Sequence, residues 1–171
     1  MNLFFRLIYT FVTCAFKSRI HPLAESVKYM RVWPNDLDLN FHVNNGRFLT
    51  LMDLGRYDLI LRTGLFRVML KKRWAPLVGA VHVRYKLSLW PFDRFRLRSK
   101  VIGWDDKWFY VEQRFEKRNR TIAVALVKTL FRGEKGNIPP QEVLRASKVY
   151  LDPPEVPEKV RIALSLYDKL N

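Results

Sequence analysis

Residues 45–62 read NGRFLTLMDLGRYDLILR, and their apolar side chains recur every three to four positions, as on one face of an α-helix. Asn44 or Asn45 is a suitable N-cap, and Gly64 follows the segment as a helix stop. Asp58 and Arg62 are spaced to form an i,i+4 ion pair. The apolar face is wide, so we expect this helix to be buried. Its two apolar rows are Phe48, Leu51, Met52, Gly55 and Leu59, and Leu54, Tyr57 and Leu61.

The segments on either side of this helix have the patterns of β-strands. Residues 26–33 have strand composition and end at a proline, and residues 81–89, 95–101 and 107–115 alternate apolar with polar side chains. Residues 121–131 are apolar almost throughout, as in an interior strand. Short polar connections separate the last four segments, which predicts an antiparallel meander. The whole order predicts an α+β fold in which one antiparallel sheet wraps around one long helix.

The length of 171 residues suits one domain with flanking segments. We expect the domain over residues 26–132, an apolar helical segment over 1–25 and a helical extension over 133–171. Within that extension, residues 139–148 and 158–170 have helical character, and a proline-rich linker separates them. Apolar residues make up 49% of the chain, which excludes a disordered or fibrous class.

The net charge of +15 is concentrated in the middle of the chain. Residues 62–135 hold 19 basic and six acidic side chains, a local excess of +13. Such a surface attracts polyanions, namely nucleic acid, anionic lipid, a phosphorylated cofactor or an acidic carrier protein. Cys14, the single cysteine, cannot form an intramolecular disulfide, so a reducing, cytoplasmic location is expected.

The first seventeen residues are strongly apolar and aromatic, with few charges. The apolar run from Leu3 to Phe16 is shorter than the roughly 20 residues that a membrane-spanning helix needs, and no cleavage site for a signal peptide follows it. Two interpretations stay open. The segment lies in a membrane interface, with nearby Arg6, Lys17 and Arg19 at the surface, or it covers the apolar surface of the domain or of a partner subunit.

The densest polar chemistry lies in residues 35–45, between a strand end and the start of the long helix. A calcium loop is excluded, because Phe41 and Arg47 stand where an EF-hand requires Gly and Glu. A transition-metal site is disfavoured, because the loop has one histidine and no cysteine. Two interpretations remain: the Asp and Asn side chains only cap turns, or a carboxylate and an imidazole work beside a helix N-terminus that polarises a carbonyl group.

Residues 36–48, DLDLNFHVNNGRF, resemble the Asp-x-Asp-x-x-x-His-x-Asn-Asn signature of hotdog-fold acyl-CoA thioesterases of the 4-hydroxybenzoyl-CoA type. Within that family the chain resembles the thioesterase-superfamily member 6-like proteins. The resemblance spans about residues 26–132. It implies a hotdog fold, a homodimer or tetramer with active sites between subunits, and metal-independent hydrolysis of an acyl-CoA or acyl-carrier thioester.

The resemblance also implies roles for individual residues. Asp38 takes the position of the catalytic carboxylate, which activates water or attacks the thioester, while His42 and Asn45 orient the reacting groups. Substrate contacts would come from Asp36, Asn44 and Gly46 in the loop, although Asp36 also suits a role in holding the loop. Coenzyme A is part of the substrate, and no separate cofactor is expected. Its phosphates would meet basic side chains of the strands, with a solvated sheet face as the alternative; these side chains are Arg84, Lys86, Arg96, Arg98 and Lys100.

Two other functions remain as alternatives. The first is a protein that binds acyl thioesters without hydrolysing them. The second is a nucleic-acid module, because aromatic side chains are interleaved with the basic strands and would offer stacking surfaces. No RNA-recognition or helix-turn-helix signature accompanies them, so nucleic acid is not the expected partner.

Overall fold

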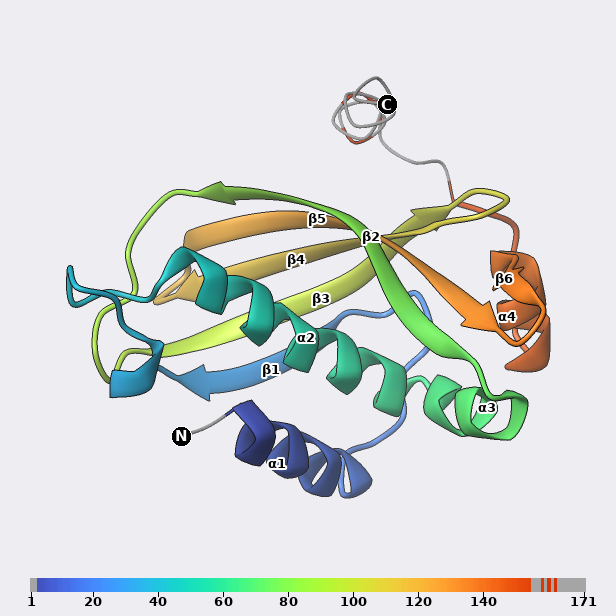
Figure 1. Cartoon of the computed structure of the whole chain (residues 1–171), viewed down its shortest axis with the longest axis horizontal. Coiled ribbons are helices and arrows are strands. Elements are labelled where there is room, and N and C mark those ends of the chain that lie inside the picture. The colour runs from blue at the N-terminus through green and yellow to red at the C-terminus, as the bar shows by residue number, and fades with distance from the viewer. Residues whose placement is uncertain (1–2, 155–157, 159, 161, 163–171) are drawn as a thin grey trace.

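The computed structural model describes residues 3–154, 158, 160 and 162, and it shows one curled antiparallel sheet around a long helix (Figure 1). This confirms the predicted architecture. The predicted helix over 158–170 lies for the most part outside the described residues. The elements are α1 (Leu3–Ala15), β1 (Ser26–Arg31), the 3-10 helix η1 (Pro34–Asp36), α2 (Asn45–Arg62), α3 (Leu65–Lys72), β2 (Ala75–Tyr85), β3 (Arg94–Trp104), β4 (Phe109–Lys117), β5 (Arg120–Gly133), β6 (Gly136–Ile138) and α4 (Pro140–Ala146).

The strand order corrects the predicted meander. The order is β1-β3-β4-β5-β2, with β6 beside β5, so β2 pairs with β5 at the far edge and not with β3. Residues 86–93 cross the end of the sheet instead of forming a hairpin. Within this crossing, the carbonyl of Leu89 accepts a hydrogen bond from Val43 N at 2.9 Å, and Leu89 is fully buried. The alternation that predicted a strand over 81–89 therefore combined the end of β2 with a crossover that buries Leu89.

Two elements were missed by the sequence analysis. The short helix α3 follows directly after Gly64. Gly64 has a positive φ of 78° and is the N-cap of this new helix. Strand β2 starts at Ala75, six positions earlier than predicted. Strand β6 has only three residues, too few to leave a periodic pattern.

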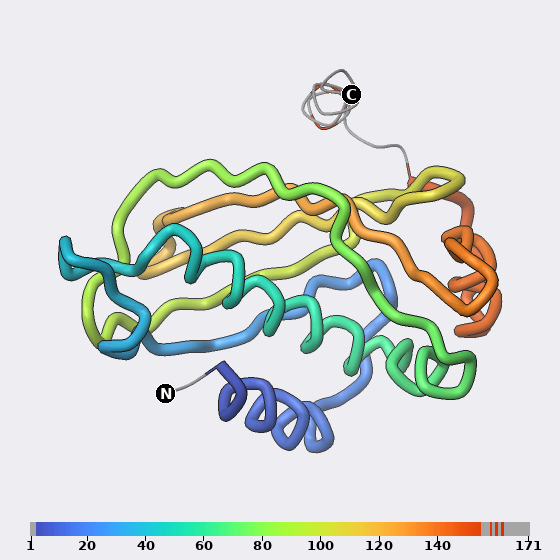
Figure 2. Tube along the Cα trace, in the orientation of Figure 1, coloured from blue at the N-terminus to red at the C-terminus, as the bar shows by residue number. Residues whose placement is uncertain are grey.

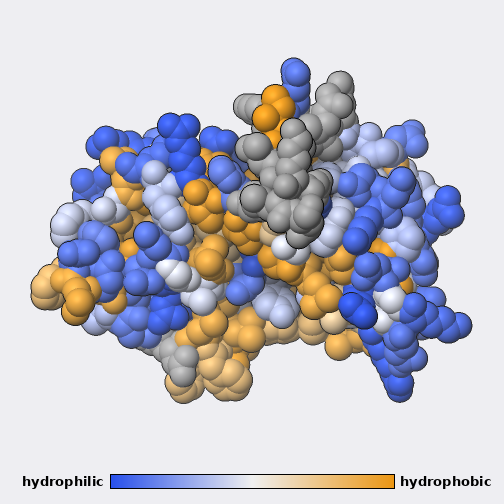
Figure 3. Space-filling model, turned by 45° about the horizontal axis from the view of Figure 1, so that its top comes forward, coloured by the Kyte–Doolittle hydropathy of each residue, from blue (hydrophilic) through white to orange (hydrophobic). Residues whose placement is uncertain are grey.

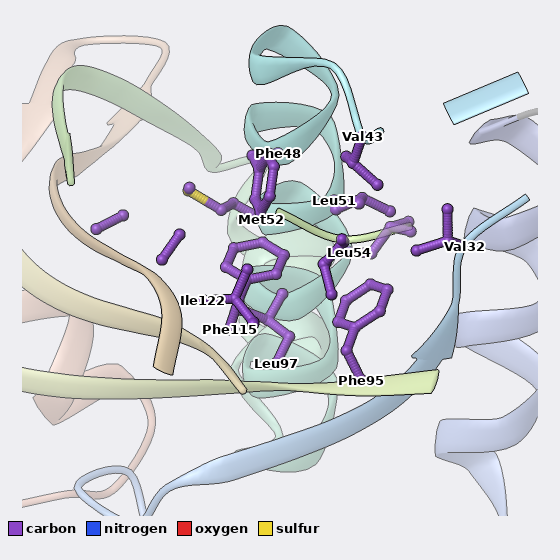
Figure 4. Packing of buried hydrophobic residues seen from close by; sticks show 13 residues of the cluster. Val32, Val43, Phe48, Leu51, Met52, Leu54, Phe95, Leu97, Phe115 and Ile122 are labelled. Carbon is purple, nitrogen blue, oxygen red and sulfur yellow. The ribbon is translucent and has the colours of Figure 1, made fainter. Parts of the chain in front are cut away.

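Helix α2 buries its apolar rows against the concave face of the sheet (Figure 4). Phe48 meets Phe115 of β4 edge-on, with ring centroids 4.9 Å apart. Gly55 allows the close approach of helix and sheet, since a Cβ there would lie 2.6 Å from Leu97 and 2.7 Å from Ser99. This packing holds the N-terminus of α2 in place at one end of the sheet.

The predicted ion pair between Asp58 and Arg62 is wrong. Asp58 is fully buried and accepts hydrogen bonds from Ser26, from Lys17 Nζ at 2.8 Å and from Cys14 Sγ at 3.2 Å. Arg62 instead donates to the carbonyl of Ser18. Asp58 points toward α1 and β1 because its helix face is covered there, and the partners come from segments distant in sequence. Helix α1 is thus fastened to α2 through a buried polar cluster.

The chain trace separates two ends of the sheet (Figure 2). The polar loop over residues 37–44 lies at one end, together with the start of α2, while β6 and α4 lie at the other end. The candidate chemistry is therefore confined to one end of the molecule.

Candidate functional site

The loop between η1 and α2 is a tight turn closed by backbone hydrogen bonds. Asp38 N donates to the carbonyl of His42 at 2.9 Å, and Phe41 N donates to the carbonyl of Asp38 at 3.1 Å. An isolated antiparallel bridge joins Leu37 and Val43 below them. Phe41 has a φ of 58° at the turn, a conformation that is strained for a bulky side chain. The turn places the side chains of Asp38 and His42 together.

Asp38 and His42 form a solvent-accessible carboxylate–imidazole pair. Nδ1 of His42 lies 3.4 Å from Oδ2 of Asp38, and their side chains are 31% and 22% exposed. The other carboxylate oxygen, Oδ1, accepts a hydrogen bond from Asn40 N at 2.8 Å. The indole of Trp90 meets the imidazole edge-on, with centroids 6.1 Å apart. The carboxylate is thus oriented from two sides and remains open to a reactant.

The first turn of α2 begins next to this pair. Asn44 is the N-cap, and its Oδ1 accepts a hydrogen bond from Gly46 N at 2.8 Å. The carbonyl of Asn45 accepts a hydrogen bond from the Tyr85 hydroxyl at 3.1 Å. Within the described chain, the N–H of Asn45 has no acceptor, and Asn44, Asn45 and Gly46 are exposed. A helix N-terminus with an unsatisfied N–H is suited to stabilise negative charge on a nearby oxygen.

Asp36 lies in a different environment, buried beneath the same loop. Its side chain is 1% exposed, and Oδ2 accepts hydrogen bonds from Arg6 at 2.5 Å and from Trp33 N at 2.9 Å. Nε of Arg47 lies 3.2 Å from Oδ1, although its direction does not make a hydrogen bond. The carbonyl of Asp36 accepts a hydrogen bond from Asn44 N at 3.0 Å. Of its two predicted roles, the geometry favours holding the loop over contacting a substrate.

The basic residues predicted to contact substrate divide into two groups. Arg84 and Lys86 lie exposed at the end of β2, and Arg84 is on the outer face of the sheet. Arg96 and Arg98 lie on β3, which β4 and β5 separate from β2. They therefore do not form one cluster within this chain.

Both arginines of β3 have partners in the chain. Arg96 donates to Glu116 at 2.6 Å and to Asn119 at 3.0 Å, while Arg98 is bonded to Glu25 at 2.7 Å. The hydrogen bond with Glu25 raises the pKa of the Arg98 guanidinium. These bonds make the β3 arginines less available to a phosphate than Arg84 and Lys86.

Four residues that organise the loop were not predicted from the sequence as part of the site: Arg6, Arg47, Tyr85 and Trp90. Arg6 is 30 positions from its partner Asp36, and no spacing rule joins them. Arg47 was considered only as a mismatch to a calcium loop. A charged residue in an otherwise apolar helix was the one available signal, because Arg6 is the only charged residue of α1.

An apolar cavity of about 140 Å³ lies beside the second half of α2, away from Asp38. Its lining within the described residues includes none of residues 36–46. Tyr57 and Ile60 of α2 face Phe131 of β5 and Val143 of α4 across it. The cavity is therefore separate from the Asp38 loop in this chain.

A model of the thioesterase-like superfamily matches residues 32–164, which is more than half of the chain. The chain belongs to this superfamily. Protein THEM6 of Danio rerio is 35% identical over 92% of this chain and 78% of its own length, and protein THEM6 of Drosophila melanogaster is 30% identical over 93% and 81%. The thioesterase family predicted from residues 36–48 is confirmed.

Solved structures confirm the hotdog fold. Gentisyl-coenzyme A thioesterase BH1999 superposes with a TM-score of 0.64 and 22% identity, over 70% of this chain and 99% of that chain. A mutant 4-hydroxybenzoyl-CoA thioesterase, complexed with 4-hydroxybenzoyl-CoA, superposes with a TM-score of 0.65 and 10% identity, over 72% and 98%. At these identities the likeness shows the fold, while the chemistry of this chain is argued from its own residues.

Proposed function

We propose that this superfamily member hydrolyses acyl-CoA thioesters with Asp38 as the reacting carboxylate. The observation that supports this most directly is the solvent-accessible Asp38–His42 pair beside the free N–H of Asn45. Hydrolysis of a thioester needs a base or nucleophile and a donor for the carbonyl oxygen. All three groups come from one tight turn and the helix that follows it.

Asp38 removes a proton from water, which attacks the thioester carbonyl, or attacks that carbon itself and forms an anhydride that water then cleaves. In both routes negative charge develops on the carbonyl oxygen, where the Asn45 N–H and the helix dipole stabilise it. His42 orients the water or the thioester from the other side of Asp38. The proposed steps use these groups without a metal ion, and the products are a carboxylate and a thiol.

Coenzyme A is the thiol carrier we propose. The structural neighbours include thioesterases whose names specify coenzyme A substrates. The Tyr85 hydroxyl contacts Asn45, so the end of β2 is close to the candidate site, and the exposed cation Lys86 follows Tyr85 where the chain leaves the strand. A cationic side chain at this place suits the phosphates of coenzyme A, and an acidic carrier protein is the second source of an acyl thioester.

A homodimer through β2 is part of this proposal. Strand β2 is an edge strand of eleven residues that pairs only with β5 among the described elements. Its exposed side chains include Leu77 and Val78, at 43% and 46% exposure. An open, partly apolar edge favours addition of a partner strand. A partner strand placed there would border the candidate site, because Tyr85 at the end of β2 contacts Asn45.

The test of the activity is the release of free thiol from a panel of acyl-CoAs that differ in chain length and in aromatic character. We expect the wild-type chain to hydrolyse at least one of them and the Asp38→Asn variant to lose that activity. Asp106→Asn, which changes an exposed acid in the β3–β4 turn, is the matched control. Binding of acyl-CoA without turnover by the wild type would show a non-catalytic acyl-thioester protein. Light scattering of a Val78→Lys variant tests the dimer, and an unchanged mass would exclude the β2 interface.

A further inference from the structure

Helix α1 buries polar residues and exposes most of its aromatic residues. The buried residues Arg6, Thr10 and Cys14 are spaced four apart and face the domain. Arg6 bonds to Asp36, and Cys14 bonds to Asp58. These polar groups can be buried because the domain provides buried hydrogen-bonding partners for them. Leu3 and Leu7 pack against the core. The exposed apolar residues of the helix face outward.

The outer face of α1 is the most aromatic exposed surface of any helix in the described chain. In the space-filling view, hydrophobic side chains gather along the lower edge of the molecule, where α1 lies (Figure 3). An exposed apolar patch of this kind marks an interaction surface. The exposed residues of this face, with their exposed fractions, are Phe4 (62%), Phe5 (60%), Ile8 (46%), Tyr9 (60%) and Val12 (54%), and Phe16 (88%) follows directly after the helix.

A cationic groove of about 750 Å³ lies directly beside this aromatic face, between α1 and the edge formed by β1 and β3. Within the described chain, the side chains of Arg94 and Arg118 have neither an ion pair nor a hydrogen bond. Glu116, the one acidic residue of the lining, is already bonded to Arg96. The cations of the lining are Arg6, Lys28, Arg31, Arg94, Arg96 and Arg118.

We propose that this surface docks on an anionic membrane, with the outer face of α1 in the interface and Arg94 and Arg118 of the groove on lipid phosphates. Aromatic side chains beside cations are the composition that an anionic lipid surface attracts. A second copy of the chain fits less well, because it would bring another +15 to a basic surface. No helix in the described part of the chain is long and apolar enough to cross a membrane.

The docking surface is mechanically joined to the Asp38 loop. Arg6 leaves the inner face of α1 and bonds to Asp36, whose carbonyl in turn accepts the hydrogen bond from Asn44 N. The docked helix and the N-terminus of α2 are therefore parts of one connected structure. This places the candidate site close to the lipid surface on which α1 rests.

The test uses the full-length chain and flotation with vesicles of phosphatidylcholine, with or without phosphatidylglycerol. We expect binding only to the vesicles that contain phosphatidylglycerol, and release by high salt. The Phe4→Ser/Phe5→Ser/Phe16→Ser variant and the Arg94→Gln/Arg118→Gln variant should each bind roughly tenfold more weakly or worse. Thermal unfolding should be unchanged, because all five side chains lie outside the core.

Matched control variants test whether vesicle binding depends on this surface, and not on any exposed aromatic side chain or on the total positive charge of the chain. Tyr150→Ser removes an exposed aromatic side chain elsewhere, and Arg132→Gln/Lys135→Gln removes two exposed cations near β6. Both controls should bind vesicles as the wild type does. Wild-type-like binding of vesicles by the phenylalanine variant would overturn the proposal. Loss of dimers in that variant would also overturn it, because the outer face of α1 would then contact a second copy of the chain. Release of the bound chain by free coenzyme A, at constant ionic strength, would assign the groove to the nucleotide instead of the membrane.

Discussion

Asp36 and Asp38 stand two positions apart in one loop, yet their environments are opposite. The Asp36 side chain is 1% exposed and lies between the guanidinium groups of Arg6 and Arg47. The Asp38 side chain is 22% exposed and faces an imidazole and solvent. A buried carboxylate held by arginines stabilises a conformation, whereas an open carboxylate beside a helix N-terminus is available for chemistry. The spacing of the two acids alone does not distinguish these roles.

The largest effect we expect is on catalysis by Asp38. The Asp38→Asn variant should lose roughly 10²–10⁴-fold in the rate of acyl-CoA hydrolysis, because the amide cannot act as base or nucleophile. Its free energy of unfolding should stay close to the wild-type value, since an amide oxygen can still accept the hydrogen bond from Asn40 N. Thiol release and urea denaturation measure the two effects. A large loss of stability in Asp38→Asn would mean that Asp38, like Asp36, mainly stabilises the conformation of the loop.

Asp36 should show the reverse pattern, with the effect on stability. Asp36→Asn leaves the buried guanidinium of Arg6 without its counter-ion and should lower the free energy of unfolding by about 3–5 kcal/mol. Denaturation in urea measures this. The double variant Asp36→Asn/Arg6→Met is the control, because it removes both charges and should recover much of the loss. If the double variant is as unstable as the single variant, the ion pair does not explain the burial of Asp36.

The sequence predicted local structure well where one periodicity governed a segment. The buried rows of α2 and the alternation of β3 and β4 were visible in the letters alone. The pairing of β2 with β5 was not, because strand pairing depends on where a crossover leads and not on the composition of the strand. Helix α3 was missed because it has only eight residues, about two turns, and directly follows the predicted helix stop at Gly64.

The same limit applies to the candidate site. The spacing of Asp38, His42 and Asn45 lies within one loop and one helix turn, so a motif could bring them together. The partner of Asp36 is on α1, 30 positions away, and only the packing of that helix reveals it. The tertiary contacts that give Asp36 and Asp38 different environments therefore could not be inferred from their spacing in the sequence.

A third carboxylate sharpens the contrast through its pH dependence. Burial raises the pKa of Asp58, but hydrogen bonds from Lys17, Ser26 and Cys14 outweigh this and hold it below its ordinary value of 3.8. Below that value the unfolded chain takes up a proton that the folded chain does not, so this stability is present above the ordinary pKa and is lost as the pH falls. The unfolding free energy of the wild type should therefore fall more steeply below about pH 4 than that of Asp58→Asn. Parallel curves of stability against pH for the two proteins would contradict this assignment.

The smallest expected effect concerns Asn44, which links the two environments. Its backbone N–H donates to the carbonyl of Asp36, and its side chain caps the helix that begins beside Asp38. Asn44→Ala removes only the cap and should cost about 1 kcal/mol of unfolding free energy. Asn44→Asp is the matched control, because it restores an acceptor for Gly46 N and should recover that stability. Hydrolysis should fall far less in Asn44→Ala than in Asp38→Asn, because the Asn45 N–H and the carboxylate both remain. If Asn44→Ala and Asp38→Asn lose equal activity, the placement of the helix N-terminus contributes as much to hydrolysis as the Asp38 carboxylate. The backbone of the loop would then be as important for catalysis as its acidic side chains.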